Sequence, residues 1–217
     1  MFPWIPILCL QAKGHMLTVC IDPGHPSEVG EGTRGKSVSE IHVAWVVAKR
    51  LQGELTKRGI RVVMTKTSER QFVRNMDRSK IANACHADLF LRLHCDSASG
   101  TGFTTYFPDR QGTVNGHRGP DQALLERIGP IAKRFQRTLA TDLKGFLKDN
   151  GLKSDLDTAV GSRQGALTGS IYAKTPVVLV EMCVLTNPKD EAKVTTAEGQ
   201  SRLARALADA AVRAIQP

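Results

Sequence analysis

Short apolar runs alternate along the chain with longer segments in which apolar residues recur every three or four positions. The short runs are rich in β-branched residues and predict strands over residues 17–21, 60–65, 88–93, 103–107 and 177–182. The longer segments predict amphipathic helices over residues 39–58, 74–86, 122–149 and 198–215, the third with a break at Gly129-Pro130. The chain is therefore expected to alternate strands with helices.

This alternation predicts an α/β fold. Several strands are continuous apolar runs, which is typical of parallel strands that are buried on both faces. We expect a single domain with a twisted, mainly parallel sheet and helices on both faces. A length of 217 residues fits one domain, and no linker, internal repeat or low-complexity tract divides it. We place this domain at residues 17–217 and treat residues 1–16 separately.

The origin of residues 1–16 stays open. Residues 2–10 (FPWIPILCL) have the length of the apolar region of a signal peptide, but no basic segment precedes them and two prolines oppose a helix. A leader whose start is lost, a weak secretion signal and an expression remnant around Gly14 are the alternatives. No stretch reaches the roughly 18 apolar residues of a transmembrane helix, so we expect no membrane span.

Charge and cysteine content narrow the function classes. Lys and Arg number 30 against 21 Asp and Glu, a net charge of +9 that favours an anionic partner. Aromatic residues are only 5% of the chain, too few for a base-stacking platform, and no nucleic-acid-binding motif is present. The five cysteines are irregularly spaced without a CxxC pair, which argues against a disulfide framework.

Four candidate catalytic side chains stand at the ends of predicted elements. His25 follows the first strand, His94 follows the third, Glu181 lies within the last strand, and Glu40 opens the first helix. Ligands of open α/β sheets bind beyond the carboxyl ends of the strands, so these groups could converge on one crevice. A catalytic zinc site uses three such ligands and one water. Two histidines and one glutamate would bind the metal, and the other glutamate could accept a proton from the water.

Each of the four residues also has a purely structural interpretation. His25 could be a surface residue after a turn, and His94 could be a hydrogen-bonded core histidine. Glu40 ends the capping-box sequence Ser-Val-Ser-Glu, in which the glutamate would close back on the helix start. Glu181 is the hardest to dismiss, because an ionised carboxylate in VVLVEMCVL is costly unless it is paired or metal-associated. A structural salt bridge is the alternative there.

Five motifs in order resemble a known family. They are CIDPGH at residues 20–25, Ser39-Glu40 before a long helix, RSKIAN at 78–83, ADLFLRLHCD at 87–96 and PVVLVEMCVLTN at 176–187. From about residue 17 to 215, the chain resembles the zinc-dependent N-acetylmuramoyl-L-alanine amidases of bacterial and phage cell-wall lysis. The resemblance implies one Zn²⁺ per chain bound by His25, Glu40 and His94, with Glu181 as the catalytic carboxylate.

The resemblance is incomplete beside two of these residues. The family usually continues with a glycine-rich segment after the first histidine, where this chain has Pro26-Ser27-Glu28-Val29-Gly30. After the catalytic glutamate, Leu or Ile and then Gly are commoner than Met182-Cys183. We expect these differences to reshape the substrate groove and to leave the metal ligands intact.

The implied activity is hydrolysis of the amide between N-acetylmuramic acid and L-alanine in peptidoglycan. A zinc peptidase that cuts elsewhere in the stem peptide is the alternative, and a catalytically inactive wall-binding module is less consistent with four intact site residues. The implied partner is peptidoglycan, an anionic wall polymer, and not nucleic acid. We expect a monomer in the cell envelope, in the periplasm or secreted.

Some amidases that the chain resembles carry an insertion after the second metal histidine, with a helix that covers the zinc until a partner removes it. Here residues 109–120 hold three glycines and a proline, and Gly129-Pro130 would stop any helix begun at residue 121. We therefore expect a mobile rim loop with His117 and Arg118 near its tip. An open metal site that requires no activator protein follows from this expectation.

Overall fold

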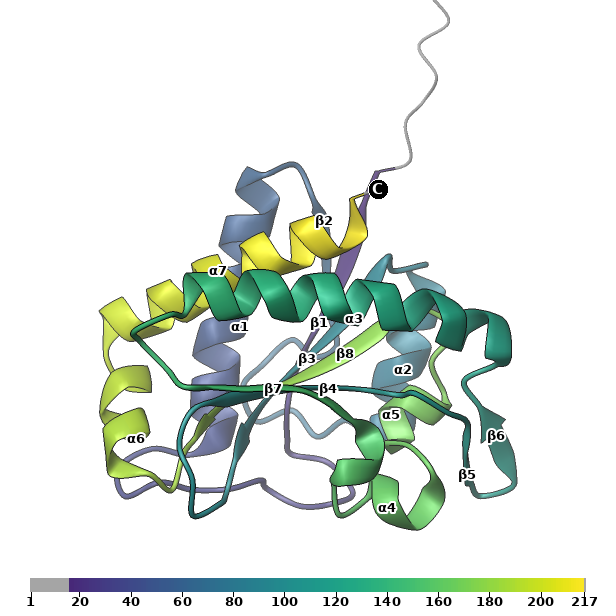
Figure 1. Ribbon diagram of the computed structural model, residues 1–217, viewed down its shortest axis with the longest axis horizontal. Coiled ribbons are helices and arrows are strands. Elements are labelled where there is room, and N and C mark those ends of the chain that lie inside the picture. Colours follow the sequence, from purple (N-terminus) through teal and green to yellow (C-terminus); the bar gives the residue numbers. More distant parts are fainter. Residues whose placement is uncertain (1–15, 217) are drawn as a thin grey trace, which may run out of the picture.

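A six-stranded sheet forms the centre of the protein in a computed structural model that describes residues 16–216 (Figure 1). Across the sheet the strands are β2 (Arg61–Met64), β1 (Thr18–Pro23), β3 (Leu89–Asp96), β8 (Val177–Val184), β4 (Phe103–Phe107) and β7 (Asp149–Ser154). The first four are mutually parallel, β4 is antiparallel to β8, and β7 is parallel to β4. The expected mainly parallel α/β sheet is confirmed.

Helices cover both faces of the sheet. Three long helices pack on one face in a large apolar cluster; they are α1 (Glu40–Lys57), α3 (Gln122–Asp142) and α7 (Ala197–Ile215). A smaller cluster on the other face includes residues of α2 (Asn75–Ala84), beside α5 (Thr168–Ile171). On β1, Val19 and Ile21 belong to the large cluster and Cys20 to the small one, which is the alternation of a strand buried on both faces. The single-domain fold is thereby confirmed for the described residues, and the question about the leader lies almost wholly outside them.

The predicted helix over residues 122–149 was wrong in two ways. First, α3 runs unbroken through Pro130, which is exposed to solvent. Because proline has no backbone N–H, the helix loses one hydrogen bond there. The buried stripe of Ile128, Ala132, Phe135 and Leu139 continues across the proline and offsets its cost. Second, α3 ends at Asp142, and residues 149–154 form the edge strand β7. The polar sequence of β7 does not predict a strand, because backbone pairing with β4 stabilises it rather than burial of apolar side chains.

The segment after β4 is also more regular than the irregular loop that we expected. It forms a hairpin of β5 (Gly112–Val114) and β6 (His117–Gly119). Asn115 and Gly116 make its two-residue turn with φ values of 50° and 76°. Asn-Gly is the preferred sequence for such a turn, because both positions require positive φ. The remaining short elements are η1 (Asp155–Asp157) and α4 (Gly161–Gln164), which precede α5, and α6 (Pro188–Val194), which precedes α7.

A buried ion cluster joins β1, β3 and α2 beneath the carboxyl end of the sheet. The Asp22 carboxylate accepts hydrogen bonds from Arg78 Nη1 at 2.6 Å, Arg92 Nε at 2.9 Å and Thr65 Oγ1 at 2.6 Å. Burial alone would raise the pKa of Asp22, but the charges of the two guanidinium groups and these hydrogen bonds lower it well below its ordinary value. All three charged side chains are almost completely inaccessible to solvent, so the cluster holds fixed charges inside the core.

Membrane-spanning structure is not found in the described part of the chain. None of the helices between residues 16 and 216 is both long and apolar enough to cross a bilayer.

We expect Asp22→Asn to lower the free energy of unfolding at pH 7 by about 3–5 kcal/mol, because two buried guanidinium groups would lose their counter-charge. Asp209→Asn is the control, since it breaks the exposed Arg58–Asp209 pair of 2.9 Å and should cost less than about 1 kcal/mol. The lowered pKa of Asp22 means that its stabilisation is complete above about pH 4 and is lost as the pH falls further. Urea unfolding measures the free energy of unfolding of both variants. An equal decrease in the two would show that the buried ion cluster stabilises the fold no more than an exposed ion pair.

Candidate metal centre

Three of the four predicted side chains meet at the carboxyl end of the sheet. His25 follows β1, Glu40 is the first residue of α1, and His94 lies on β3, and their ligand atoms all lie within 4.8 Å of one another. Glu40 Oε1 is 2.9 Å from His94 Nδ1 and 3.6 Å from His25 Nε2. The side chains are only 3–13% exposed, so the three groups form a preformed cluster at the base of a pocket.

The loop after β1 fixes the orientation of His25. Its Nδ1 lies 2.9 Å from the Gly30 carbonyl oxygen, which accepts a hydrogen bond when Nδ1 is protonated and leaves Nε2 free as a ligand. Lys66 Nζ donates to the His25 carbonyl oxygen and holds the backbone on the other side. Gly32, at φ 75°, passes so close that a Cβ there would lie 2.6 Å from the His25 ring and would also meet the Glu40 carboxylate. A side chain at position 32 would therefore displace both groups.

Glu40 is not the closing residue of a capping box. The N-cap of α1 is Ser39, whose Oγ accepts from the His42 N–H, whereas the box would require Ser37 at that position. The Glu40 carboxylate turns the other way and accepts from the backbone N–H groups of Thr33 at 2.8 Å and Cys95 at 3.1 Å.

The protonation states favoured for Glu40 and His94 suit the binding of a cation. Burial alone would raise the pKa of Glu40, but the hydrogen bond and charge of His94 and the charge of His25 lower it. Burial lowers the pKa of His94, despite the opposing effect of Glu40, and so favours the neutral imidazole that can ligate a metal. An ionised carboxylate and a neutral imidazole are the forms in which both groups bind metal.

The spacing of the ligand atoms and one orphaned oxygen support the fit to a metal, with Nδ1 as the ligand atom of His94. Glu181 Oε2 is buried and has no hydrogen-bond partner among the described residues. Buried polar atoms rarely stay unpartnered, so the pocket suits a further polar group beside this carboxyl. About 3.3 Å separates two ligand atoms that both lie about 2.0–2.1 Å from a tetrahedral zinc ion. The observed 2.9 Å and 3.6 Å lie on either side of that spacing, and two nitrogens with one carboxylate match the ligand preference of zinc.

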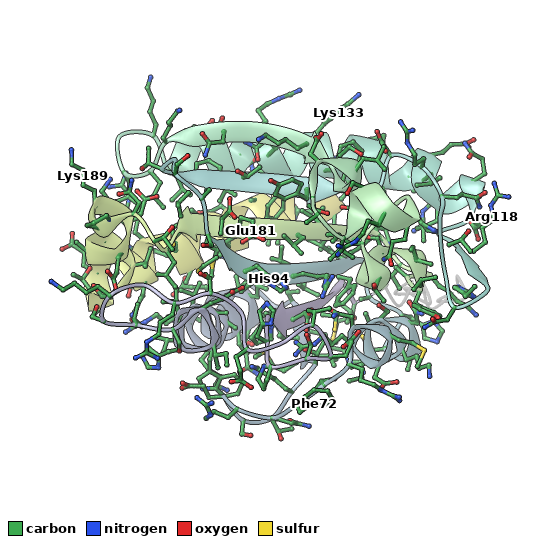
Figure 2. All side chains as sticks on the ribbon, turned by 90° about the horizontal axis from the view of Figure 1, so that it is seen from below. Phe72, His94, Arg118, Lys133, Glu181 and Lys189 are labelled. Carbon is green, nitrogen blue, oxygen red and sulfur yellow. The ribbon has the colours of Figure 1, made fainter. Side chains whose placement is uncertain are left out.

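Glu181 lies on β8 directly opposite His94 in the strand register, and Figure 2 shows the two side by side at the open edge of the sheet. No ion pair links it to any residue between 16 and 216, so the salt-bridge interpretation finds no partner. Burial raises the pKa of Glu181 well above its ordinary value, and the charges of Glu40 and Asp96 add to this. A carboxyl group with these properties can hold a proton near neutral pH and give it up.

A pocket of about 200 Å³ contains His25, His94 and Glu181. Its floor includes Asn75 and Arg92, and its opposite wall comes from the segment between β7 and α5; the other lining residues are Val29, Thr158, Ala159, Val160, Leu167, Thr168 and Leu179. Sequence reasoning missed this wall and Arg92. A charged residue inside DLFLRL carries the same indication of a buried charge that singled out Glu181.

The remaining sequence expectations concern the rim. None of residues 109–130 lines this pocket, and His117 instead stacks on Tyr172 with ring centroids 4.4 Å apart. Figure 2 places Arg118 at the margin of the molecule, away from His94. Of the departures from the family pattern, Val29 lines the pocket, whereas Met182 and Cys183 are buried in the core and do not line it.

Several proteins with similar sequences are described as amidases. LytC of Bacillus subtilis is described as an N-acetylmuramoyl-L-alanine amidase and is 29% identical over 198 residues, which cover 90% of this chain and 35% of LytC. AmiA of Escherichia coli, described in the same way, is 27% identical over 92% of this chain and 76% of its own. The chain thus spans about a third of the length of LytC and three quarters of AmiA.

Solved structures share the fold. Ami1 of Mycobacterium smegmatis superimposes with a TM-score of 0.72 at 21% identity, covering 92% of this chain and 96% of its own. An amidase of Clostridium difficile 630 gives 0.71 at 23% identity, covering 91% and 95%. The profile of the Amidase_3 family, described as N-acetylmuramoyl-L-alanine amidase, matches residues 19–213. With nearly its whole length matched, the chain belongs to this amidase family.

Proposed function

We propose that the protein is a zinc-dependent amidase that hydrolyses the bond between N-acetylmuramic acid and L-alanine in peptidoglycan. The observation that carries the proposal is a buried cluster of two histidines and a glutamate beside an unpaired glutamate, within an amidase-family fold. His25, Glu40 and His94 would bind one zinc ion, and Glu181 would be the catalytic carboxylate. Residues 17–217 would form the catalytic domain.

The residues of the pocket divide the chemistry between them. When bound, zinc would polarise the amide carbonyl and lower the pKa of a coordinated water towards neutrality. Glu181 would take a proton from the attacking water and pass it to the leaving amine of L-alanine, a role that its raised pKa suits. The Gly30 carbonyl orients His25, and the backbone N–H groups of Thr33 and Cys95 orient Glu40. Apolar residues of the wall, such as Val160 and Leu167, would limit the access of bulk water.

The same proposal covers partner and location. LytC and AmiA are named N-acetylmuramoyl-L-alanine amidases, and LytH of Staphylococcus aureus is named a probable cell wall amidase, so the substrate would be met in the cell envelope, in the periplasm or outside the cell. A net charge of +9 favours association with an anionic wall polymer. We propose that the protein is a monomer. We also propose that its site is open, because residues 109–121 contain the β5–β6 hairpin and α3 starts only at Gln122, so no helix in this segment could cover the metal.

Digestion of purified sacculi tests the reaction. We expect the purified protein alone to release intact stem peptides with a free L-alanine amine and to leave glycan strands with free lactyl groups. Mass spectrometry of the products identifies the bond, and light scattering gives the oligomeric state. Cleavage within the stem peptide would support a zinc peptidase instead, and activity that appears only with an added partner would contradict the open site.

Metal removal tests the ligand set. A strong chelator should abolish hydrolysis, and added zinc should restore it. His94→Ala should lose stoichiometric zinc binding, since only two of the three ligands would remain, and metal analysis of the purified variant measures this. His42→Ala is the matched control, because His42 lies on the same helix as Glu40 but contacts Glu69 at the surface. Wild-type zinc affinity in His94→Ala would refute the assignment.

Substitution of Glu181 tests the proton transfer. Glu181→Gln keeps the size of the side chain and should retain zinc and thermal stability while kcat falls by roughly 10²–10⁴, the usual scale of general acid–base catalysis. Steady-state hydrolysis of a soluble muropeptide, together with a zinc assay and a thermal melt, measures all three properties. A near-normal kcat would exclude Glu181 from the mechanism, whereas loss of folding would favour a structural role.

A further inference from the structure

A second charged groove lies where the ends of α3 and α7 cross. It has a volume of about 320 Å³ and is lined by Arg134, Arg137, Thr138, Arg213 and Gln216. Every lining side chain offers hydrogen-bond donors, and among residues 16–216 no carboxylate, aromatic or aliphatic side chain lines it. Three guanidinium groups around one groove repel each other, so this arrangement favours an anionic ligand.

None of the three arginines forms an ion pair with a described residue, although the charge of Arg213 acts on nearby Asp142. Arg134 donates through Nε and Nη2 to the Ala214 carbonyl at 3.2 Å and 2.6 Å, which caps the last turn of α7 and fixes the guanidinium in place. Arg137 and Arg213 are exposed and form no ion pair within the described part of the chain. The Arg134 guanidinium is therefore fixed by hydrogen bonds, and the exposed side chains of Arg137 and Arg213 can contact a ligand.

The nearest acidic residues only partly balance this charge. Asp142 and Asp209 line an adjoining groove together with Arg137 and Arg213. Asp209 is already paired with Arg58, which adds a fourth arginine to the region. Within the described part of the chain, four arginines thus face two aspartates here, and no acidic side chain lines the groove itself.

The groove lies at the opposite end of the molecule from the catalytic pocket. Figure 1 shows α7 running from α6 to the C-terminal end of the chain, away from the carboxyl ends of the parallel strands β1, β3 and β8, where His25, His94 and Glu181 lie. A ligand in the groove would not compete with substrate. It would attach the protein through the side opposite the catalytic pocket and leave the carboxyl ends of the strands accessible to substrate.

We propose that this groove, Arg134, Arg137 and Arg213 with Thr138, is a second binding site for a phosphodiester polymer of the cell envelope. Guanidinium groups bind phosphate oxygens through paired hydrogen bonds, and a phosphodiester keeps its charge at all physiological pH values. Among residues 16–216 no aromatic side chain lines the groove, which disfavours a single-stranded nucleic acid, and no aliphatic side chain lines it, which disfavours insertion into a membrane. This site goes beyond the proposed amidase activity, and only the choice of an envelope polymer as its ligand rests on the location proposed with that activity.

Binding of poly(glycerol phosphate) to the full chain tests the proposal by titration calorimetry. The double variant Arg137→Gln/Arg213→Gln should bind the polymer about ten-fold or more weakly than the wild type, because two of the three guanidinium contacts are lost. Arg127→Gln/Arg205→Gln is the matched control: it removes the same charge from exposed positions of the same two helices, outside the groove, and should change the affinity less than about two-fold. Hydrolysis of a soluble muropeptide should be unchanged in both variants.

Three results would overturn the proposal. Equal losses in the two double variants would show that only net charge matters. Equally tight binding of polyglutamate would remove the preference for phosphate. Groove-dependent binding to phosphatidylglycerol vesicles, without binding to the polymer, would assign the site to a lipid surface. None of these results bears on the amidase proposal, which the muropeptide assay reports separately.

Discussion

The carboxylate of Asp22, buried between the guanidinium groups of Arg78 and Arg92, connects the parts of the chain that build the metal centre. Asp22 precedes His25 by three residues, and Arg92 precedes His94 by two on β3. Arg78 also donates to the carbonyl groups of Pro23 and Pro26, on either side of His25. One ion cluster therefore sets the positions of both histidine-bearing segments. Desolvation makes such a cluster costly to form, so removal of one partner destabilises the fold more than the complete cluster stabilises it.

A second buried carboxylate organises the opposite wall of the pocket. Asp155 Oδ2 accepts from the Leu167 N–H at 3.0 Å, and its carbonyl oxygen accepts from both the N–H and the Oγ1 of Thr158. It thereby closes the loop that contributes residues 158–160, Leu167 and Thr168 to the pocket. Burial raises the pKa of Asp155 to about 6, in contrast to Asp22, because no arginine contacts its carboxylate directly. The metal side of the pocket is held by ion pairs, and the wall by hydrogen bonds to the carboxyl group and the backbone carbonyl of one residue, Asp155.

The metal centre and the arginine groove lie at opposite ends of the parallel strands. Parallel strands place the metal-binding residues at their carboxyl ends, and the return of α7 brings its last turn to their amino ends, where the arginine groove forms. The helix layer between them is packed with small residues, since α7 contributes Ala204, Ala208 and Ala211 to the core. This close packing lets α3 and α7 cross with their polar faces outward. Substrate chemistry and a surface for attachment can then coexist on one small domain.

The sequence by itself determined the alternation of strands and helices, the continuous apolar strands and hence the parallel sheet. It also determined the four candidate site residues, because polar groups at strand ends converge whenever the strands are parallel. It could not decide between the capping box and the metal cluster for Glu40, since that choice depended on where α1 begins and on the backbone of Thr33 and Cys95. Tertiary structure alone carried α3 through Pro130, where packing outweighed propensity, and formed β7 from a polar segment by pairing it with β4. The arginine groove also needed tertiary structure, because Arg134 and Arg213 lie far apart in sequence and meet only where two helices cross.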